Sequence, residues 1–305
     1  MTYDAETIRI RANGISFEVA TMGSGDRLAL CLHGFPESAY SWRYQLPLLA
    51  KLGYRARAPN LRGYRSSDSP QSVAAYRLKT LVDDVAALIE ASGARETLLM
   101  GHDWGGALAW LIAMDRPALI NRLIILNLPH PACFAREVKR PAQFMKSWYV
   151  LLFQIPLLPE LLLGAFHAWG IGEMIRQTSR DPSRFPEETL AVYRQNASRP
   201  GGLTAMLNWY RASLQCGGWR TLNRDSYPKI ETPTLFLWGD ADAALSIRTT
   251  RGTDKYVSDL TLRVFHGVSH WIQQEAAEAV NLMIAAWLGG TRVPEYHEMN
   301  REILS

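Results

Sequence analysis

The run MGHDWGGALAW, residues 100–110, decides the fold, because it leads a buried strand into a helix through a turn that needs small residues. The segment ETLLMGHD is an apolar run typical of a strand, and Gly105 to Met114 has the composition of a buried helix. Small residues flank Asp103, so the backbones crowd together and its side chain is exposed at the end of the strand. The pattern predicts a nucleophile elbow that carries a carboxylate.

Two interpretations of Asp103 stay open from this stretch alone. The N–H groups of the first helical turn favour an anionic oxygen, which keeps a carboxylate ionised and able to attack. Aspartate is also a common helix cap, and a capping side chain needs no catalytic role. Residues elsewhere in the chain have to decide between these two roles.

Strands and helices alternate on both sides of the elbow. TIRIRA and ISFEVAT flank Asn13-Gly14 in the manner of a hairpin, and RLALCLHG, YRARAPN and LIILNLPH have the pattern of further strands. Helical patterns lie near residues 42–52 and 76–93. This alternation predicts an α/β fold with a mainly parallel, doubly wound sheet.

The alternation stops at about Pro129 and resumes after about Lys229. The sequence between them is rich in Trp, Leu, Phe, Pro and Arg, with helical stretches and no convincing strand, and TPTLFLWGDAD then restores the strand pattern. We therefore predict a core of residues 1–129 and 230–290, an inserted helical cap of residues 130–229, and a polar tail, residues 291–305, without regular structure.

Composition and charge argue against several kinds of partner. The chain has 305 residues, 48% hydrophobic and 20% charged, and its net charge of +4 is spread without a Lys/Arg block, which gives no reason to expect nucleic acid.

The three cysteines lie far apart in the sequence, which predicts no metal or redox pair and a reducing, cytoplasmic location. The N-terminal residues lack the pattern of an export signal. Gln154, Pro156, Pro159 and Glu160 interrupt the apolar run 149–172, so we predict no transmembrane segment.

A second glycine-containing turn supplies hydrogen-bond donors. LCLHGFPES places His33-Gly34-Phe35-Pro36 directly after a buried strand, where Gly34 permits the turn. The backbone N–H of Phe35 can join that of Trp104 to form an oxyanion hole beside Asp103.

A base and the acid that orients it are expected late in the chain. His270, in GVSHWIQ, lies in a loop after the last strand, whereas its rival His266 ends that strand and is more typical of a structural residue. The acid is Asp242 or Asp240, and Asp242 is favoured because it lies deeper in the loop while Asp240 can serve the turn. The strand LIILNLPH offers Asn127 but no carboxylate.

Together these motifs resemble those of the α/β-hydrolase-fold epoxide hydrolases, over nearly the whole chain before Thr291. Two other families with an aspartate nucleophile differ at one position each. Haloalkane dehalogenases usually have Asn in place of Phe35, and fluoroacetate dehalogenases have Arg in place of Trp104. At position 65 the epoxide hydrolases commonly have Gly, whereas this sequence has Arg65. The loop that contains Arg65 carries no catalytic group. The resemblance rests on His33-Gly34-Phe35-Pro36, Gly101-His102-Asp103-Trp104-Gly105-Gly106, the loop Gly239 to Asp242, and His270-Trp271.

The resemblance implies that an epoxide is opened to a vicinal diol through an ester of Asp103, with His270 activating water and with no metal or cofactor. It also implies that Tyr149 and Tyr210 donate hydrogen bonds to the epoxide oxygen, since the family's two ring-opening tyrosines stand at these positions. Dehalogenation of a haloalkane or haloacid by the same aspartate is the alternative function. A non-catalytic binder of small molecules on this fold is a further one.

Aromatic side chains indicate what the site accepts. We expect substrate contacts from Phe153 and Trp271, and Trp148, Phe166 and Trp169 add to the apolar character of the cap. The predicted partners are a small apolar epoxide and water, and the sequence assigns no oligomeric state.

Overall fold

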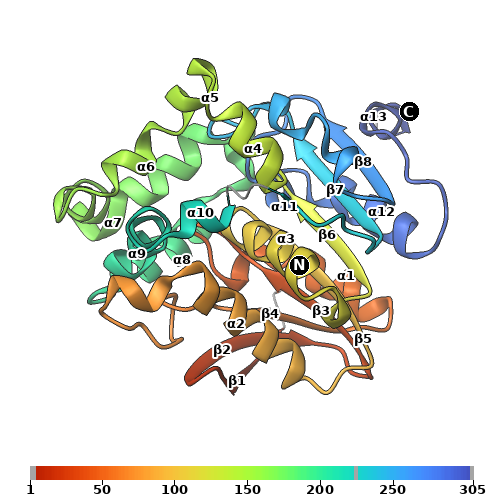
Figure 1. Cartoon of the computed structure of the whole chain (residues 1–305), viewed down its shortest axis with the longest axis horizontal. Coiled ribbons are helices and arrows are strands. Elements are labelled where there is room, and N and C mark those ends of the chain that lie inside the picture. The colour runs from red at the N-terminus through yellow and green to blue at the C-terminus, as the bar shows by residue number, and fades with distance from the viewer. Residues whose placement is uncertain (1–4, 223–225, 303–305) are drawn as a thin grey trace.

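Eight strands form one sheet in the computed structural model, which describes residues 5–222 and 226–302 (Figure 1). Their order across the sheet is β1-β2-β4-β3-β5-β6-β7-β8. β1 pairs with β2 and β2 with β4 in antiparallel register, and the other neighbouring strands are parallel. The strands are β1 (Glu6–Ala12), β2 (Ile15–Met22), β3 (Arg27–Leu32), β4 (Arg55–Pro59), β5 (Glu96–His102), β6 (Arg122–Leu126), β7 (Thr234–Gly239) and β8 (Leu260–Phe265).

This sheet confirms the predicted fold class, with one antiparallel hairpin at its edge. Asn13 and Gly14 turn the hairpin with φ values of 45° and 77°, a left-handed conformation that Asn and Gly tolerate better than other residues. The hairpin then meets the parallel strands through β4.

The central strands bury both of their faces. In β3, Leu28, Leu30 and Leu32 belong to the apolar cluster that includes α2 and α3, whereas Ala29 and Cys31 belong to the cluster that includes α1 and α12. Double burial explains why such strands are continuous apolar runs in the sequence. Each fully buried leucine contributes roughly 1.5–3 kcal/mol to folding. The helices of the core are α1 (Gln45–Lys51), α2 (Leu78–Glu90), α3 (Trp104–Asp115), α11 (Ile272–Glu275) and α12 (Ala277–Leu288).

Seven α-helices and one short 3₁₀ helix, Pro182–Arg184, follow β6 and precede β7 in the described part of the chain, and we call residues 131–222 the cap. As the sequence predicts, the described residues of this segment contain helices and no strand. The cap forms the left side of the molecule in Figure 1. Residues 5–222 and 226–302 include no helix long and apolar enough to cross a bilayer. The helices are α4 (Pro131–Glu137), α5 (Pro141–Lys146), α6 (Trp148–Leu152), α7 (Leu158–Thr178), α8 (Glu187–Ala197), α9 (Gly202–Gln215) and α10 (Gly218–Leu222).

The structure differs from the sequence analysis at the C-terminal end. The tail was expected to lack regular structure, but it contains α13 (Tyr296–Glu302). Val293 and Met299 are buried in the α1/α12 cluster, and the ring of Tyr296 stacks on Phe265 of β8 with centroids 4.7 Å apart. These apolar residues recur every three positions among polar ones, so their shared face was hidden by the polar composition of the segment.

Candidate active site

Asp103 occupies the turn between β5 and α3 in a conformation that is rare for a residue with a side chain. Its φ is 49° and its ψ is −124°, which stores roughly 1–3 kcal/mol of strain. A Cβ at Gly34 would lie 2.3 Å from the Cβ of Asp103, and one at Gly105 would lie 2.1 Å from the carbonyl oxygen of Leu32. Although Asp103 precedes α3, its side chain makes no capping hydrogen bond. Helix capping therefore does not explain this aspartate.

The carboxylate of Asp103 lies between a backbone donor and a histidine. Its Oδ1 accepts the backbone N–H of Phe35 at 2.8 Å, and its Oδ2 is 3.5 Å from Nε2 of His270. The other ring nitrogen of His270, Nδ1, is 2.6 Å from Oδ2 of Asp242. Residues from the ends of β3, β5, β7 and β8 thus meet in one continuous chain of polar contacts.

The structure separates the two candidate acids and the two candidate bases. Asp240 binds His266 at 2.8 Å, and the side chain of His266 is 71% exposed at the surface. Asp242 and His270 are both buried and pair with each other. The rivals in the sequence therefore form a pair of their own at the surface.

Asp242 is held by several donors besides His270. The side-chain amide of Asn127 donates to its Oδ2 at 2.8 Å, and the N–H groups of Ala244 and Leu245 donate to its Oδ1 at 2.7 and 2.9 Å. Asn127 also joins β6 to β7, because its Oδ1 accepts the N–H of Gly239 at 2.8 Å. The amide at the end of β6 thus supports the acid at the end of β7.

The charges of this group shift one another's pKa values. Burial disfavours the imidazolium form of His270, but the charges and hydrogen bonds of Asp242 and Asp103 outweigh burial and raise the pKa of His270 well above its ordinary value. Burial likewise opposes ionisation of Asp103 and Asp242, yet His270 lowers the pKa of both carboxyl groups. The geometry therefore favours two carboxylates around one imidazolium.

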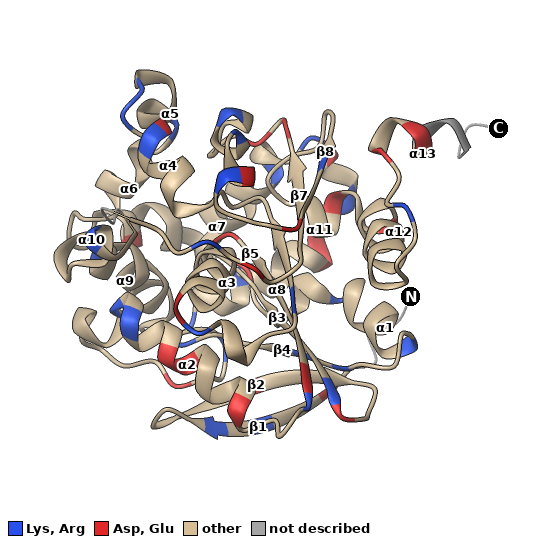
Figure 2. Cartoon of the chain, turned by 45° about the vertical axis from the view of Figure 1, so that its right-hand side comes forward, with Lys and Arg blue, Asp and Glu red and all other residues tan. Residues whose placement is uncertain are grey.

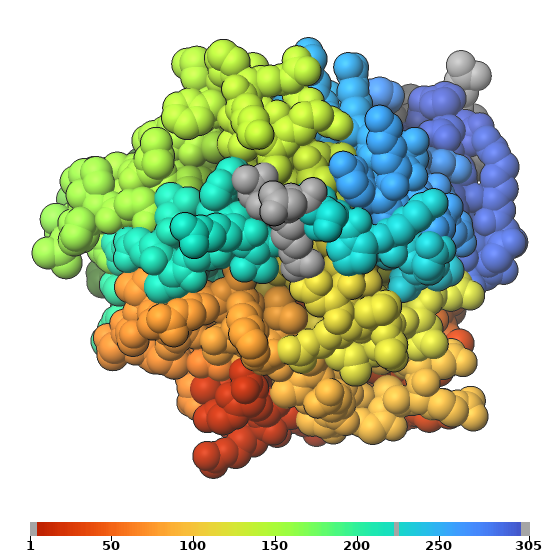
Figure 3. Space-filling view, in the orientation of Figure 1, coloured from red at the N-terminus to blue at the C-terminus, as the bar shows by residue number. Residues whose placement is uncertain are grey.

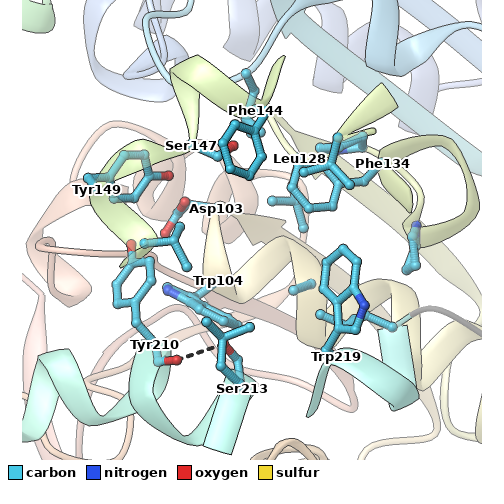
Figure 4. A pocket seen from close by; sticks show the side chains of 18 of the residues that line it. Asp103, Trp104, Leu128, Phe134, Phe144, Ser147, Tyr149, Tyr210, Ser213 and Trp219 are labelled. Carbon is cyan, nitrogen blue, oxygen red and sulfur yellow. Dashed lines mark hydrogen bonds between the residues drawn. The ribbon is translucent and has the colours of Figure 1, made fainter. Parts of the chain in front are cut away.

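A cavity of about 400 Å³ opens between Asp103 and the cap (Figure 4). Tyr149 of α6 and Tyr210 of α9 line it together with Trp104, and the hydroxyl groups of both tyrosines point toward Asp103. Burial, followed by the charge of Asp103, raises the pKa of both phenols well above the ordinary value. The ring of Trp104 packs edge-on against that of Tyr210, with centroids 5.1 Å apart. Two neutral phenols and one carboxylate thus face a largely apolar space.

Phe153 and Trp271, the expected substrate contacts, are placed beside the cavity lining and are not part of it. Phe153 packs edge-on against Tyr210, with centroids 4.9 Å apart, and Trp271 packs against His270 at 5.0 Å. The indole N–H of Trp271 donates to Oγ1 of Thr178 at 3.0 Å. Phe153 therefore packs against Tyr210, and Trp271 against His270, on the side away from the cavity. Trp148, Phe166 and Trp169 are exposed.

A buried pair of polar side chains, His102 and Glu37, was not predicted although both residues lie within the sequence motifs. Nδ1 of His102 is 2.8 Å from Oε2 of Glu37, and Nε2 of His102 donates to the carbonyl oxygen of His270 at 2.8 Å. Gln273 and Gln274 donate to the other oxygen of Glu37. Polar residues in the first two motifs were the available signal, but sequence spacing does not reveal that they meet. In the described ranges, no group of three or more His, Cys, Asp or Glu side chains is arranged to hold a metal ion.

Comparison with known proteins places the chain in a family. Residues 30–277 match the model of the α/β hydrolase fold. The chain is 37% identical to the AB hydrolase superfamily protein YfhM of Bacillus subtilis (92% of this chain, 96% of the relative) and 37% identical to human Epoxide hydrolase 4 (92% and 78%). It is also similar to the crystal structure of Bacillus megaterium epoxide hydrolase in complex with an inhibitor, with a TM-score of 0.85 and 26% identity over 92% of this chain and 100% of that one. The chain belongs to the epoxide hydrolases of the α/β-hydrolase fold.

Proposed function

We propose that this enzyme converts a small apolar epoxide and water into a vicinal diol through a covalent ester on Asp103. One observation carries the proposal: the carboxylate of Asp103 and the phenols of Tyr149 and Tyr210 face the same apolar cavity. A nucleophile on one side of a strained ring and hydrogen-bond donors on the other are what ring opening requires.

In the first step, an oxygen of Asp103 attacks one carbon of the epoxide. The new carbon–oxygen bond forms as the ring bond breaks, and the ring oxygen becomes an alkoxide. Tyr149 and Tyr210 donate hydrogen bonds to that oxygen, and their raised pKa values keep them protonated as donors at neutral pH. The alkoxide then takes up one proton to become an alcohol.

In the second step, His270 becomes the base. The ester of Asp103 carries no charge, so His270 loses one of the two carboxylates that raise its pKa. The alkoxide gains one proton and His270 loses one, so the net charge of the site does not change. Neutral His270, oriented by Asp242, removes a proton from water, which attacks the ester carbonyl. The N–H groups of Phe35 and Trp104 stabilise the oxyanion that forms. As the oxyanion collapses, the bond between the acyl carbon and the diol oxygen breaks, and that oxygen takes the second proton of the added water. The diol leaves, and Asp103 is again a carboxylate beside the protonated His270.

Dehalogenation is the alternative that the same aspartate allows. Against it, the side chain of Phe35 has no amide to hold a halide. Asp103 is the only charged side chain among the cavity-lining residues of the described chain, so this lining offers no cation to a haloacid carboxylate.

A turnover panel decides between these reactions. Purified protein is given styrene oxide, an aliphatic epoxide, a haloalkane and fluoroacetate, and diol and halide are measured side by side. We expect diol from the epoxides and none with Asp103→Ala. Faster halide release than epoxide opening would establish the dehalogenase. Tight binding of epoxides without any product would establish a non-catalytic binder.

We further infer that the enzyme works in a reducing compartment such as the cytoplasm. Cys31, Cys133 and Cys216 form no disulfide, and burial raises the pKa of the Cys31 thiol. Free thiols are the form that a reducing environment maintains.

A further inference from the structure

Most of the exposed large apolar side chains lie on one part of the cap. Of thirteen such side chains among the described residues, eleven lie between Phe144 and Trp169. We call these eleven the cap patch. They occupy α5, α6, α7 and the intervening turn, along the upper left of the molecule (Figure 3). Met145 is 72% exposed, Leu161 69% and Phe166 88%. Scattered apolar residues are normal on a surface, whereas a concentration of this kind marks a contact region.

The cavity that contains Asp103 reaches the surface within the cap patch. Phe144 and Leu151 line the cavity and are also 55% and 53% exposed. An apolar molecule held against the cap patch is therefore next to the opening of the cavity. Under the proposed function the substrate is an apolar epoxide, which concentrates in lipid rather than in water.

The chain segment that carries the cap patch has little negative charge. Residues 139–172 contain the cations Lys139, Arg140 and Lys146 and a single acidic residue, Glu160. The carboxylate of Glu160 is 2.7 Å from a guanidinium nitrogen of Arg211, so it is already neutralised. This segment therefore presents a net positive charge.

A cationic cluster borders the cap patch at the end of α4. Three arginines, Arg136, Arg140 and Arg248, contact the carboxylate of Glu137 at 3.0, 3.2 and 3.7 Å. Three guanidinium groups on one carboxylate leave an excess of two positive charges. Figure 2 shows blue segments around α4 and α5 next to the uncharged α6.

We propose that the cap patch docks onto the anionic surface of a lipid bilayer. Lys139 and Arg140 lie against the headgroups, and the apolar side chains enter the boundary between headgroups and acyl chains. Trp148 and Trp169, which are 60% and 54% exposed, are of the residue type enriched at that boundary. A second copy of the chain fits less well, because a symmetric pair through this patch brings like charges together.

Vesicle flotation tests the proposal without any need for turnover. The protein is mixed with vesicles of phosphatidylcholine and phosphatidylglycerol in equal parts, or of phosphatidylcholine alone, and centrifuged. We expect flotation with the anionic vesicles, and at least about tenfold weaker binding to the neutral ones, since cations are attracted to an anionic membrane surface. High salt should release the protein. Absence of flotation with the anionic vesicles would overturn the proposal and leave the proposed function untouched.

Two double variants locate the surface. Met145→Glu with Leu161→Glu removes apolar contacts, and Lys139→Glu with Arg140→Glu reverses the cations; each should weaken flotation at least about tenfold. The matched control is Leu282→Glu, because Leu282 is an apolar residue on α12, 56% exposed and outside the cap patch. We expect this control to float like the parent. Equal loss in the control, or a dimer in analytical ultracentrifugation that the Met145/Leu161 variant dissociates, would contradict membrane docking.

Discussion

Asp103 and Asp242 share one histidine but differ in how the backbone holds them. Asp242 accepts three hydrogen bonds from Asn127, Ala244 and Leu245 in addition to the contact with His270. Asp103 accepts a single backbone N–H, that of Phe35, and lines the cavity. A carboxylate that is less fully hydrogen-bonded is a better nucleophile, because less stabilisation is lost on attack. The difference in hydrogen bonding supports the proposal that Asp103 attacks and that Asp242 orients His270.

Replacing His270 with Gln should stop the reaction after its first step. In the proposed mechanism Asp103 attacks without help from a base, so the variant should react with one equivalent of epoxide and then cease to turn over. Intact-protein mass spectrometry should show an increase equal to the mass of the substrate, located on the peptide that contains Asp103. Asp103→Ala serves as the control and should give neither adduct nor diol. Normal turnover by the His270 variant would show that another residue is the base.

Replacing Tyr149 or Tyr210 with Phe should slow ring opening by about two to three orders of magnitude, the usual effect of losing one preorganised donor. Ester hydrolysis should change much less, since the phenols face the ring oxygen and not the acyl carbonyl. Single-turnover kinetics separates the two steps. The matched control is Tyr193→Phe, a buried cap tyrosine that donates to Gln274 and is not part of the cavity lining. Unchanged alkylation in both active-site variants would favour halide chemistry.

At the scale of elements, helix α5 connects the cap to the loop that holds Asp242. The side-chain amide of Gln143 donates to the carbonyl oxygen of Ala244 at 2.9 Å and accepts the N–H of Ser246 at 2.8 Å. Nζ of Lys146 donates to the backbone carbonyl of Asp242 at 2.6 Å. The helix that precedes Tyr149 therefore also fixes the loop of Asp242.

Gln143→Ala should lower the free energy of unfolding by about 1–3 kcal/mol, because this buried side chain loses its hydrogen bonds to Ser147, Ala244 and Ser246. It should also slow ester hydrolysis more than alkylation, since the loop of Asp242 loses its support while Asp103 is unaffected. Gln177→Ala is the control, because Gln177 is exposed on α7 and its side-chain amide donates a long hydrogen bond of 3.4 Å to the carboxylate of Glu173. Denaturant unfolding and single-turnover kinetics measure both effects. Equal slowing of the two steps would contradict the role given to α5.

The elements differed in how well the sequence predicted them. Strands such as β3 and β7 were predictable because burial on both faces demands continuous apolar runs. The apolar run EAAEAVNLMIAAWL forms α12, Ala277–Leu288, and the short helix α11, Ile272–Glu275, precedes it. The two helices are separated at Ala276, whose φ is −119° and ψ is 42°. The carboxylate of Glu275, at the end of α11, accepts the backbone N–H groups of Ser269 and Arg180. Such contacts between distant segments are not visible in a sequence, so α11 could not be predicted from it.

At the scale of the whole molecule, the pH dependence of stability should follow His270. Its pKa is raised in the folded state, so its contribution is fully present below the unfolded pKa, about 6.5, and is lost as the pH rises through the folded value. The carboxyl groups of Asp103 and Asp242 have lowered pKa values, so their contribution is lost as acid protonates them. The Tm difference between the parent and His270→Gln should therefore be largest in weak acid and shrink toward alkaline pH. A difference that grows with pH would contradict this charge arrangement.

Contacts between segments that lie far apart in the chain were the part of the site that the sequence could not predict. The motifs around Asp103 and His270 could be recognised in the sequence, because each needs particular residues at fixed spacing. The pairing of Glu37 with His102 and the separation of Phe153 from the cavity depend on how distant segments pack. Spacing along a chain carries no information about such contacts, so they appeared only in three dimensions.

The distribution of the three thiols has a practical consequence. Cys31 and Cys133 are buried, and burial raises the pKa of both, whereas Cys216 is half-buried at the end of α9. A maleimide dye should therefore react with Cys216 first, less than two helical turns beyond Tyr210. The natural sequence thus provides a labelling position on the helix that carries a proposed ring-opening acid. Fluorescence from that position can follow the cap during a single turnover without any engineered substitution.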